Sequence, residues 1–214
     1  MKPCTVLIVD DHKVMRQGLR ALLAAAPGIE IVGEAATGRE AVDLAAALKP
    51  QAVVMDIAMP ELNGIEATRR ITERSPEIRV VVLSMYADAE YLFRAFQAGA
   101  SGYLLKESAV DEIVAALRAA CAGRRYVGSG IALEGAPDEI LEARASPLER
   151  LSAREREVLQ LVVEGHSSTE IGAAIHLSPK TVDSYRSRLM KKLGVKDFAA
   201  LVKFAVQHGL TRPH

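Results

Sequence analysis

The first 122 residues alternate short runs rich in Val and Ile with longer segments rich in Ala and Leu. The short runs are typical of buried strands, and the longer ones are typical of helices. Such alternation predicts an α/β fold, in which helices cover both faces of a parallel sheet. We expect five strands, near residues 5–9, 29–34, 51–55, 79–83 and 102–105. Five helices are expected near residues 13–25, 38–48, 64–74, 88–98 and 109–121.

Two of these helix starts carry a polar residue followed three positions later by an acid. Asn63 precedes Glu66, and Ser108 precedes Asp111. A side-chain oxygen at such a position can accept hydrogen bonds from the first amides of a helix, and an acid in the first turn favours the helix dipole. We therefore expect Asn63 and Ser108 to cap their helices.

The alternation stops at Gly123, and residues 123–150 contain four Gly and two Pro without a sustained period. This composition predicts a linker between a domain over residues 1–122 and a second domain over residues 151–214. The DEILEARA stretch within the linker can form a helical turn or two.

The second domain shows no strand pattern and is predicted to contain four helices. Residues 152–155 and 167–170 each have the sequence of a capping box that opens an apolar run. Ser178-Pro179 supplies a cap followed by proline at the first helical position, and Gly194 ends that helix. A final helix is expected over residues 197–208, which makes this a small all-α domain.

Polar side chains stand where apolar segments of the first domain end. They are Asp10, Asp11, Asp56, Ser84 and Lys106. An acid pair after a strand, taken alone, is usually a solvated turn or a helix cap. The carboxyl ends of parallel strands, however, meet at one edge of the sheet, where ligands bind. The five residues together therefore predict one site.

Three carboxylates, a hydroxyl and an amine suit an aspartate that accepts a phosphoryl group. A carboxylate is a poor nucleophile toward a phosphoryl group because both are anionic, so a divalent cation with oxygen ligands must neutralise the charge. Asp10, Asp11 and Asp56 can supply that acidic pocket. Lys106 and Ser84 can stabilise charge on the phosphoryl oxygens.

Three segments resemble the receiver domain of two-component response regulators: VLIVDDHKVMRQGL, VVMDIAMPELNGIEA and VVVLSMYADAEYLFRAFQAGASGYLLK. The resemblance covers the first 120 residues. It implies a flavodoxin-like, doubly wound sheet with strand order 2-1-3-4-5. It also implies that Asp56 receives its phosphoryl group from the phosphohistidine of a sensor histidine kinase.

The same resemblance implies roles for the residues around Asp56. Mg²⁺ is expected to be held directly by Asp11, Asp56 and the backbone carbonyl of Ala58, and by Asp10 through water. Ser84 and Tyr103 are expected to form the switch. In that switch the hydroxyl moves toward the phosphoryl group and the aromatic ring turns inward.

The third predicted helix of the second domain, SPKTVDSYRSRLMKKL, has one apolar stripe containing Val182, Leu189 and Leu193, with Tyr185 nearby. The opposite side carries basic and small polar residues. Such residues can contact DNA phosphates or base edges, although a solvated helix face has the same composition. The candidate DNA contacts are Lys180, Thr181, Asp183, Ser184, Ser187, Arg188 and Lys191.

The segment LSAREREVLQLVVEGHSSTEIGAAIHLSPKTVDSYRSRLMKKLGV resembles the LuxR-type helix-turn-helix. A receiver joined to this domain is the arrangement of the NarL/FixJ subfamily of response regulators. The resemblance implies that the helix beginning at Pro179 reads double-stranded DNA and that the last helix pairs two copies. The predicted protein is a transcription regulator, not an enzyme, that forms a DNA-binding homodimer when phosphorylated.

Composition agrees with this reading but adds little. The chain has 27 basic and 27 acidic residues, whereas residues 147–214 hold 11 Lys and Arg against 7 Asp and Glu. Cys4 and Cys121 lack metal-site spacing and are interpreted as ordinary thiols of a reducing cytosol. No apolar run approaches the roughly 18 residues of a membrane span, so we expect a cytoplasmic protein without membrane partners.

Two other functions are considered. A phosphohydrolase could use Asp56 as a covalent nucleophile, but such enzymes need a second acid two residues later, where this chain has Ala58. A scaffold could bind partners through the receiver without being phosphorylated. The intact polar set at the predicted strand ends argues against a scaffold.

Overall fold

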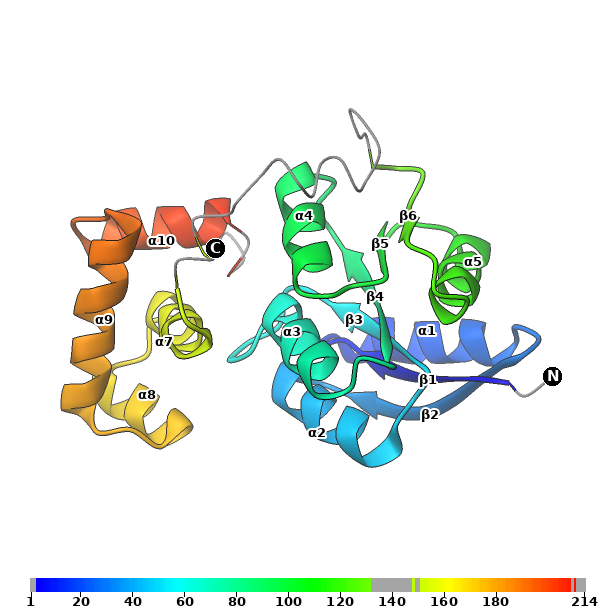
Figure 1. The fold of residues 1–214 in the computed structure, drawn as a ribbon, viewed down its shortest axis with the longest axis horizontal. Helices are drawn as coiled ribbons and strands as arrows, with labels where there is room; N and C mark the ends of the chain where they lie inside the picture. Colours follow the sequence, from blue (N-terminus) through cyan, green and yellow to red (C-terminus); the bar gives the residue numbers. More distant parts are fainter. Residues whose placement is uncertain (1–2, 132–147, 149–150, 209, 211–214) are drawn as a thin grey trace. The chain divides into compact units, whose positions relative to one another are not determined.

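The computed structural model describes residues 3–131, 148, 151–208 and 210 (Figure 1). The chain divides into two compact units, residues 1–144 and residues 145–214. Within the described parts, no helix is both long enough and apolar enough to cross a membrane.

The first unit is built on a parallel sheet with the order β2-β1-β3-β4-β5-β6. Its strands are β1 (Cys4–Val9), β2 (Ile29–Ala35), β3 (Ala52–Asp56), β4 (Arg79–Ser84), β5 (Gly102–Leu105) and β6 (Tyr126–Val127). Its helices are α1 (Lys13–Ala24), α2 (Gly38–Leu48), α3 (Gly64–Arg74), α4 (Ala89–Gln97) and α5 (Val110–Cys121). The predicted α/β fold and the order 2-1-3-4-5 are confirmed.

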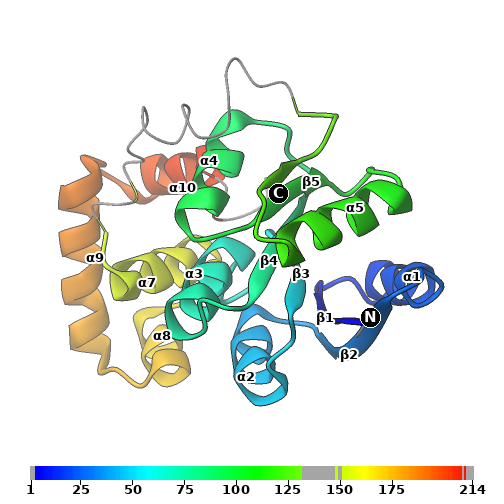
Figure 2. The same cartoon turned by 45° about the vertical axis from the view of Figure 1, so that its right-hand side comes forward.

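Helices cover both faces of this sheet. Figures 1 and 2 show α1 and α5 on one face and α2, α3 and α4 on the other. Alternate residues of a strand point to opposite faces, so β1 sends Val6 and Ile8 to the α1 and α5 core and Leu7 and Val9 to the other core. Burial on both sides explains the continuous apolar runs in the sequence.

The sixth strand was not predicted and lies inside the segment expected to be linker. The Tyr126 amide donates to the Ser101 carbonyl at 3.0 Å, and the Gly128 amide donates to the Tyr103 carbonyl at 2.9 Å. Ile131 is buried in the core beneath α2, α3 and α4. The sheet therefore continues past residue 122. A two-residue strand is too short to produce a periodic pattern in the sequence.

One of the two predicted helix caps is confirmed and the other is wrong. The Asn63 side chain accepts a hydrogen bond from the Glu66 amide at 2.9 Å. Helix α5 starts one residue later than expected for a Ser108 cap, because Ala109 occupies the cap position and makes no side-chain hydrogen bond.

The second unit contains α7 (Ala153–Val163), α8 (Ser168–Ile175), α9 (Pro179–Leu193) and α10 (Phe198–Gln207). These are the four helices expected from the sequence. Both capping boxes form, at Ser152 and at Ser167, and Gly194 ends α9 in the left-handed region with φ 68°. The four helices share one apolar core. The DEILEARA stretch of the predicted linker lies outside the described residues.

Candidate functional site

The three acids predicted to meet do so at the carboxyl end of the sheet. Asp10 and Asp11 follow β1, and Asp56 ends the neighbouring strand β3. Asp10 is 1% exposed and Asp56 is 2% exposed, whereas Asp11 is more accessible. Ligand atoms of these acids and of His12 all lie within 4.8 Å of one another. The convergence inferred from strand ends is therefore present.

Lys106 bridges two of these carboxylates. Its Nζ lies 2.7 Å from Asp10 Oδ2 and 2.8 Å from Asp56 Oδ2, and its side chain is 6% exposed. The main chain fixes its position. Strands β4 and β5 pair up to Ser84 and Leu105, and the Lys106 amide, one residue further, donates to the Ser84 carbonyl at 2.7 Å. The ammonium can therefore contact an oxygen-rich group that joins Asp56.

Burial dominates the acidity of Asp56. Removal from water raises the pKa of its carboxyl from 3.8 to about 6, although the Lys106 ammonium opposes the shift and nearby Asp10 adds to it. Asp56 is thus ionised at neutral pH only at a cost to the folded state. A bound cation would relieve that cost.

Asp56→Asn is expected to stabilise the metal-free protein at pH 8. Because the pKa of Asp56 is higher in the folded state than in the unfolded state, the native protein holds this proton more tightly. The stability that the protonated carboxyl contributes below pH 4 is therefore lost as the pH rises through about 6. The variant has no charge to bury, so its advantage should grow from near zero at pH 4 to at most about 3 kcal/mol at pH 8. Urea unfolding with a chelator present measures it. A variant no more stable than wild type at pH 8 contradicts this account.

The chain around Asp56 leaves no room for a side chain at Gly64. A Cβ there would lie 1.9 Å from the Asp56 carbonyl oxygen. The Gly64 amide also donates to the Ile57 carbonyl at 2.8 Å. The start of α3 therefore packs directly against the backbone of the acidic site and holds the loop after β3 in place.

Ser84 and Tyr103 lie near this site in fully buried positions. Ser84 ends β4 one residue beyond Leu83, the register partner of Asp56, and its hydroxyl accepts a hydrogen bond from the Tyr86 amide at 3.0 Å. The Tyr103 ring already lies inside the fold, where its hydroxyl donates to the Tyr86 carbonyl at 2.8 Å. Burial raises the pKa of Tyr103. Both residues thus contact the same β4–α4 connection.

His12 belongs to the cluster but was not predicted. Its Nδ1 lies 2.8 Å from Asp11 Oδ1, and its amide donates to Asp10 Oδ1 at 2.8 Å. Its position directly after the two acids was the available signal. The carboxylate pattern of a hard-cation site does not single it out, because such cations prefer oxygen ligands to imidazole.

The donor set fits a hard divalent cation such as Mg²⁺. Three carboxylates surround one point, and Mg²⁺ prefers oxygen ligands. The Ala58 amide donates to Asp56 Oδ1 at 3.3 Å, so the main chain at Ala58 lies next to that carboxylate. The role of the Ala58 carbonyl as a metal ligand stays a prediction.

Helix α9 shows the two faces predicted for the helix that begins at Pro179. Val182 and Leu189 are fully buried in the core of the second unit, with Tyr185 and Leu193 packed against it. Thr181 is half-buried, with its hydroxyl 2.7 Å from the hydroxyl of the cap Ser178. The remaining candidate contacts are exposed: Lys180, Asp183, Ser184, Ser187, Arg188 and Lys191.

Contacts between helices orient α9. Asp183 Oδ1 accepts a hydrogen bond from the Ser168 hydroxyl of α8 at 2.5 Å. On another side, Lys192 Nζ lies 2.6 Å from Glu155 Oε2 of α7. Lys192 is therefore paired within the domain. The exposed basic residues among the candidate DNA contacts of α9 are Lys180, Arg188 and Lys191.

Both units match known families. Residues 6–118 match the response regulator receiver domain, and residues 149–205 match the bacterial regulatory proteins of the luxR family. The chain therefore belongs to the two-component response regulators of the NarL/FixJ type. It is a DNA-binding transcriptional regulator.

Individual relatives extend over nearly the whole chain. The response regulator UvrY of Escherichia coli O6:H1 is 39% identical over 206 residues, covering 96% of this chain and 94% of UvrY. The response regulator GacA of Pseudomonas aeruginosa is 38% identical, with 96% of each chain covered. The solved structure of Salmonella typhimurium RcsB, described in terms of conformational dynamism for DNA interaction, has a TM-score of 0.67 at 27% identity, covering 98% of this chain and all of that one.

Proposed function

We propose that Asp56 accepts a phosphoryl group from a sensor histidine kinase and that this modification turns on DNA binding by a homodimer. The observation that carries the proposal is the Lys106 ammonium between Asp10 and Asp56, at 2.7 and 2.8 Å, in a pocket of three carboxylates. An arrangement with this much buried charge costs stability, which is typical of functional sites.

Each residue has a distinct part in the proposed transfer. A carboxylate oxygen of Asp56 attacks phosphorus as the bond to the donor's imidazole nitrogen breaks. Lys106 stabilises charge on the transferred group, and the Ser84 hydroxyl turns from the Tyr86 amide toward a phosphoryl oxygen. Movement of Ser84 and the β4–α4 connection would also release the Tyr86 carbonyl from Tyr103.

Mg²⁺ would be held by Asp11, Asp56 and the Ala58 carbonyl, with Asp10 acting through water. When bound, it neutralises charge on the acceptor and on the incoming phosphoryl oxygens. His12 lies at the open side of the cluster, where its side chain can contact Asp11.

DNA binding by a dimer is supported by a relative. RcsB has been solved in complex with DNA, and another structure contains two RcsB dimers bound to two parallel DNAs. A dimer places two recognition helices on two half-sites. We propose the same use of α9 here, with Lys180, Arg188 and Lys191 on phosphates or bases and the smaller Thr181, Ser184 and Ser187 close to the groove.

Incubation with acetyl phosphate separates a phosphorylated regulator from a scaffold. The purified protein should gain one phosphoryl group, seen in its intact mass, when Mg²⁺ is present, and none when a chelator removes the metal. Uptake that is absent under both conditions would favour a scaffold that binds partners without modification.

Asp183→Ala is expected to change base preference more than general affinity. A carboxylate repels phosphates, but it can accept from a cytosine amine or disfavour wrong bases. The ratio of specific to random DNA affinity should fall about tenfold, because one base contact contributes on the order of 1–3 kcal/mol. Fluorescence anisotropy on both DNAs measures it.

Ser168→Ala is the matched control for this variant. It removes the hydrogen bond to Asp183 but leaves the carboxylate on α9, so its effect on the ratio should be smaller. Equal loss of affinity on specific and random DNA with Asp183→Ala would reject a role in base selection.

A further inference from the structure

The two cysteines of the chain, 117 positions apart in sequence, meet in space. The sulfur atoms of Cys4 and Cys121 lie 2.9 Å apart. Cys4 begins β1 and Cys121 ends α5. Both are free thiols, as interpreted from the sequence, but the fold brings them into contact, which their spacing in the sequence did not indicate.

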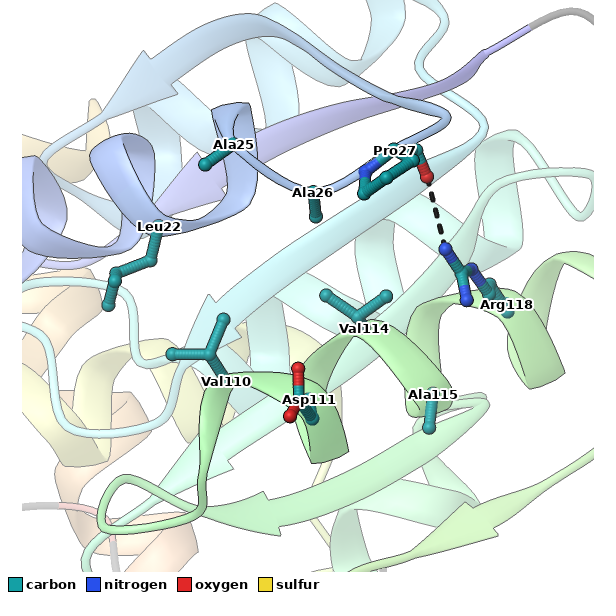
Figure 3. A pocket seen from close by; sticks show the side chains of 9 residues that line it. All are labelled: Leu22, Ala25, Ala26, Pro27, Val110, Asp111, Val114, Ala115 and Arg118. Atoms are coloured by element: carbon teal, nitrogen blue, oxygen red, sulfur yellow. Dashed lines mark hydrogen bonds between the residues drawn. The ribbon is translucent and has the colours of Figure 1, made fainter.

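Nearby hydrogen bonds hold the two chain segments side by side. The Cys4 amide donates to the Gly28 carbonyl at 2.8 Å, and the Arg118 guanidinium, one turn before Cys121, donates to the Pro27 carbonyl at 3.1 Å. Figure 3 shows Arg118 reaching across to Pro27 at one end of a pocket between α1 and α5. The α1–β2 turn thus connects both cysteine-bearing segments.

Geometry and exposure both permit a disulfide. The sulfurs need to approach by about 0.9 Å to reach the S–S bond length. Cys121 is exposed and Cys4 is partly exposed, so a small oxidant can reach the pair.

The two thiols are also unequal in acidity. A hydrogen bond from the Cys4 thiol lowers the pKa of Cys121 to about 7 against the effect of burial, and nearby Arg79 adds to the lowering. The same hydrogen bond and burial raise the pKa of Cys4. Cys121 is thus the better nucleophile at neutral pH, since the thiolate is the reactive form.

We propose that Cys4 and Cys121 are a reversible redox site of the receiver domain, at which a peroxide produces an intramolecular disulfide and thiol reductants restore both thiols. The Cys121 thiolate attacks one peroxide oxygen, the O–O bond breaks, and hydroxide leaves. The Cys4 sulfur then attacks the resulting sulfenic acid, the S–S bond forms, and water departs with the proton of Cys4. One peroxide is reduced for two thiols oxidised. In a reducing cytosol such a disulfide is transient, as expected for a redox sensor.

Peptide mapping of the full-length protein after hydrogen peroxide treatment tests this proposal. One molar equivalent should remove both thiols from reaction with a thiol reagent and lower the intact mass by two hydrogen atoms. Trypsin under non-reducing conditions should release residues 1–13 linked to residues 119–124. Dithiothreitol should separate them again.

Single variants distinguish the two thiols. Cys4→Ser should stop at a sulfenic acid on Cys121, which dimedone traps, whereas Cys121→Ser should leave Cys4 largely unmodified at the same dose. Three results in the wild-type protein would overturn the proposal: two thiols that persist, a disulfide that joins two chains, or a single cysteine oxidised to sulfinic acid while the other stays reduced.

Discussion

Asp56→Asn abolishes phosphoryl uptake from acetyl phosphate, while the fold is retained. An amide has no anionic oxygen to attack phosphorus, and the other two acids cannot replace it. Asp10 is held by Lys106 and the His12 amide, and Asp11 lies against His12. The expected loss is complete, because removing the nucleophile removes the reaction itself. Intact mass after incubation with acetyl phosphate and Mg²⁺ measures it.

Asp43→Asn is the matched control for this result. Asp43 lies exposed on α2, outside the acidic site, so its variant should be phosphorylated like the wild type. Phosphorylation of Asp56→Asn at the wild-type rate would place the acceptor elsewhere and remove the basis of the proposed switch.

Lys106→Met lowers the free energy of unfolding at pH 8 by about 3–5 kcal/mol in metal-free protein. This is the cost of removing one partner from a buried ion pair, because the charge left behind keeps its desolvation penalty. Here two carboxylates, Asp10 and Asp56, lose the ammonium that lies 2.7 and 2.8 Å from them. The loss should shrink at pH 5, where the folded variant binds a proton between the two acids. Urea unfolding at both pH values measures it.

Lys13→Met removes an equal charge from an exposed position at the start of α1 and should change stability by less than about 0.5 kcal/mol. If Lys106→Met unfolds at the same urea concentration as wild type at pH 8, Lys106 does not hold the acidic site together.

The fold and the acidic site could be predicted from the sequence because both follow from repeated, local patterns. Each apolar run is a strand buried on two faces, and parallel strands must present their carboxyl ends at one edge. Asp10, Asp56 and Lys106 could thus be assigned to one site, although Asp10 and Lys106 are 96 positions apart in the sequence. The capping boxes at Ser152 and Ser167 could be predicted for the same reason, since each involves only four consecutive residues.

Features that depend on three-dimensional contact were missed. Strand β6 exists because β5 offers it a free edge, and the two residues themselves carry no period. Ser108 has the composition of a cap, yet α5 begins from Ala109. The spacing of Cys4 and Cys121 in the sequence does not predict their contact. The contact arises because α5 packs against the face of the sheet that contains β1.

DNA binding with and without a phosphodonor tests the central claim most directly. Wild-type protein and Asp56→Asn would be mixed with fragments of genomic DNA, with Mg²⁺ present and acetyl phosphate either added or omitted. We predict that acetyl phosphate raises the affinity of wild-type protein for a selected set of fragments at least about fivefold, within the usual range of coupling between sites, and leaves the variant unchanged. Equal affinity of wild-type protein under both conditions, or an equal increase in the variant, would contradict control through Asp56.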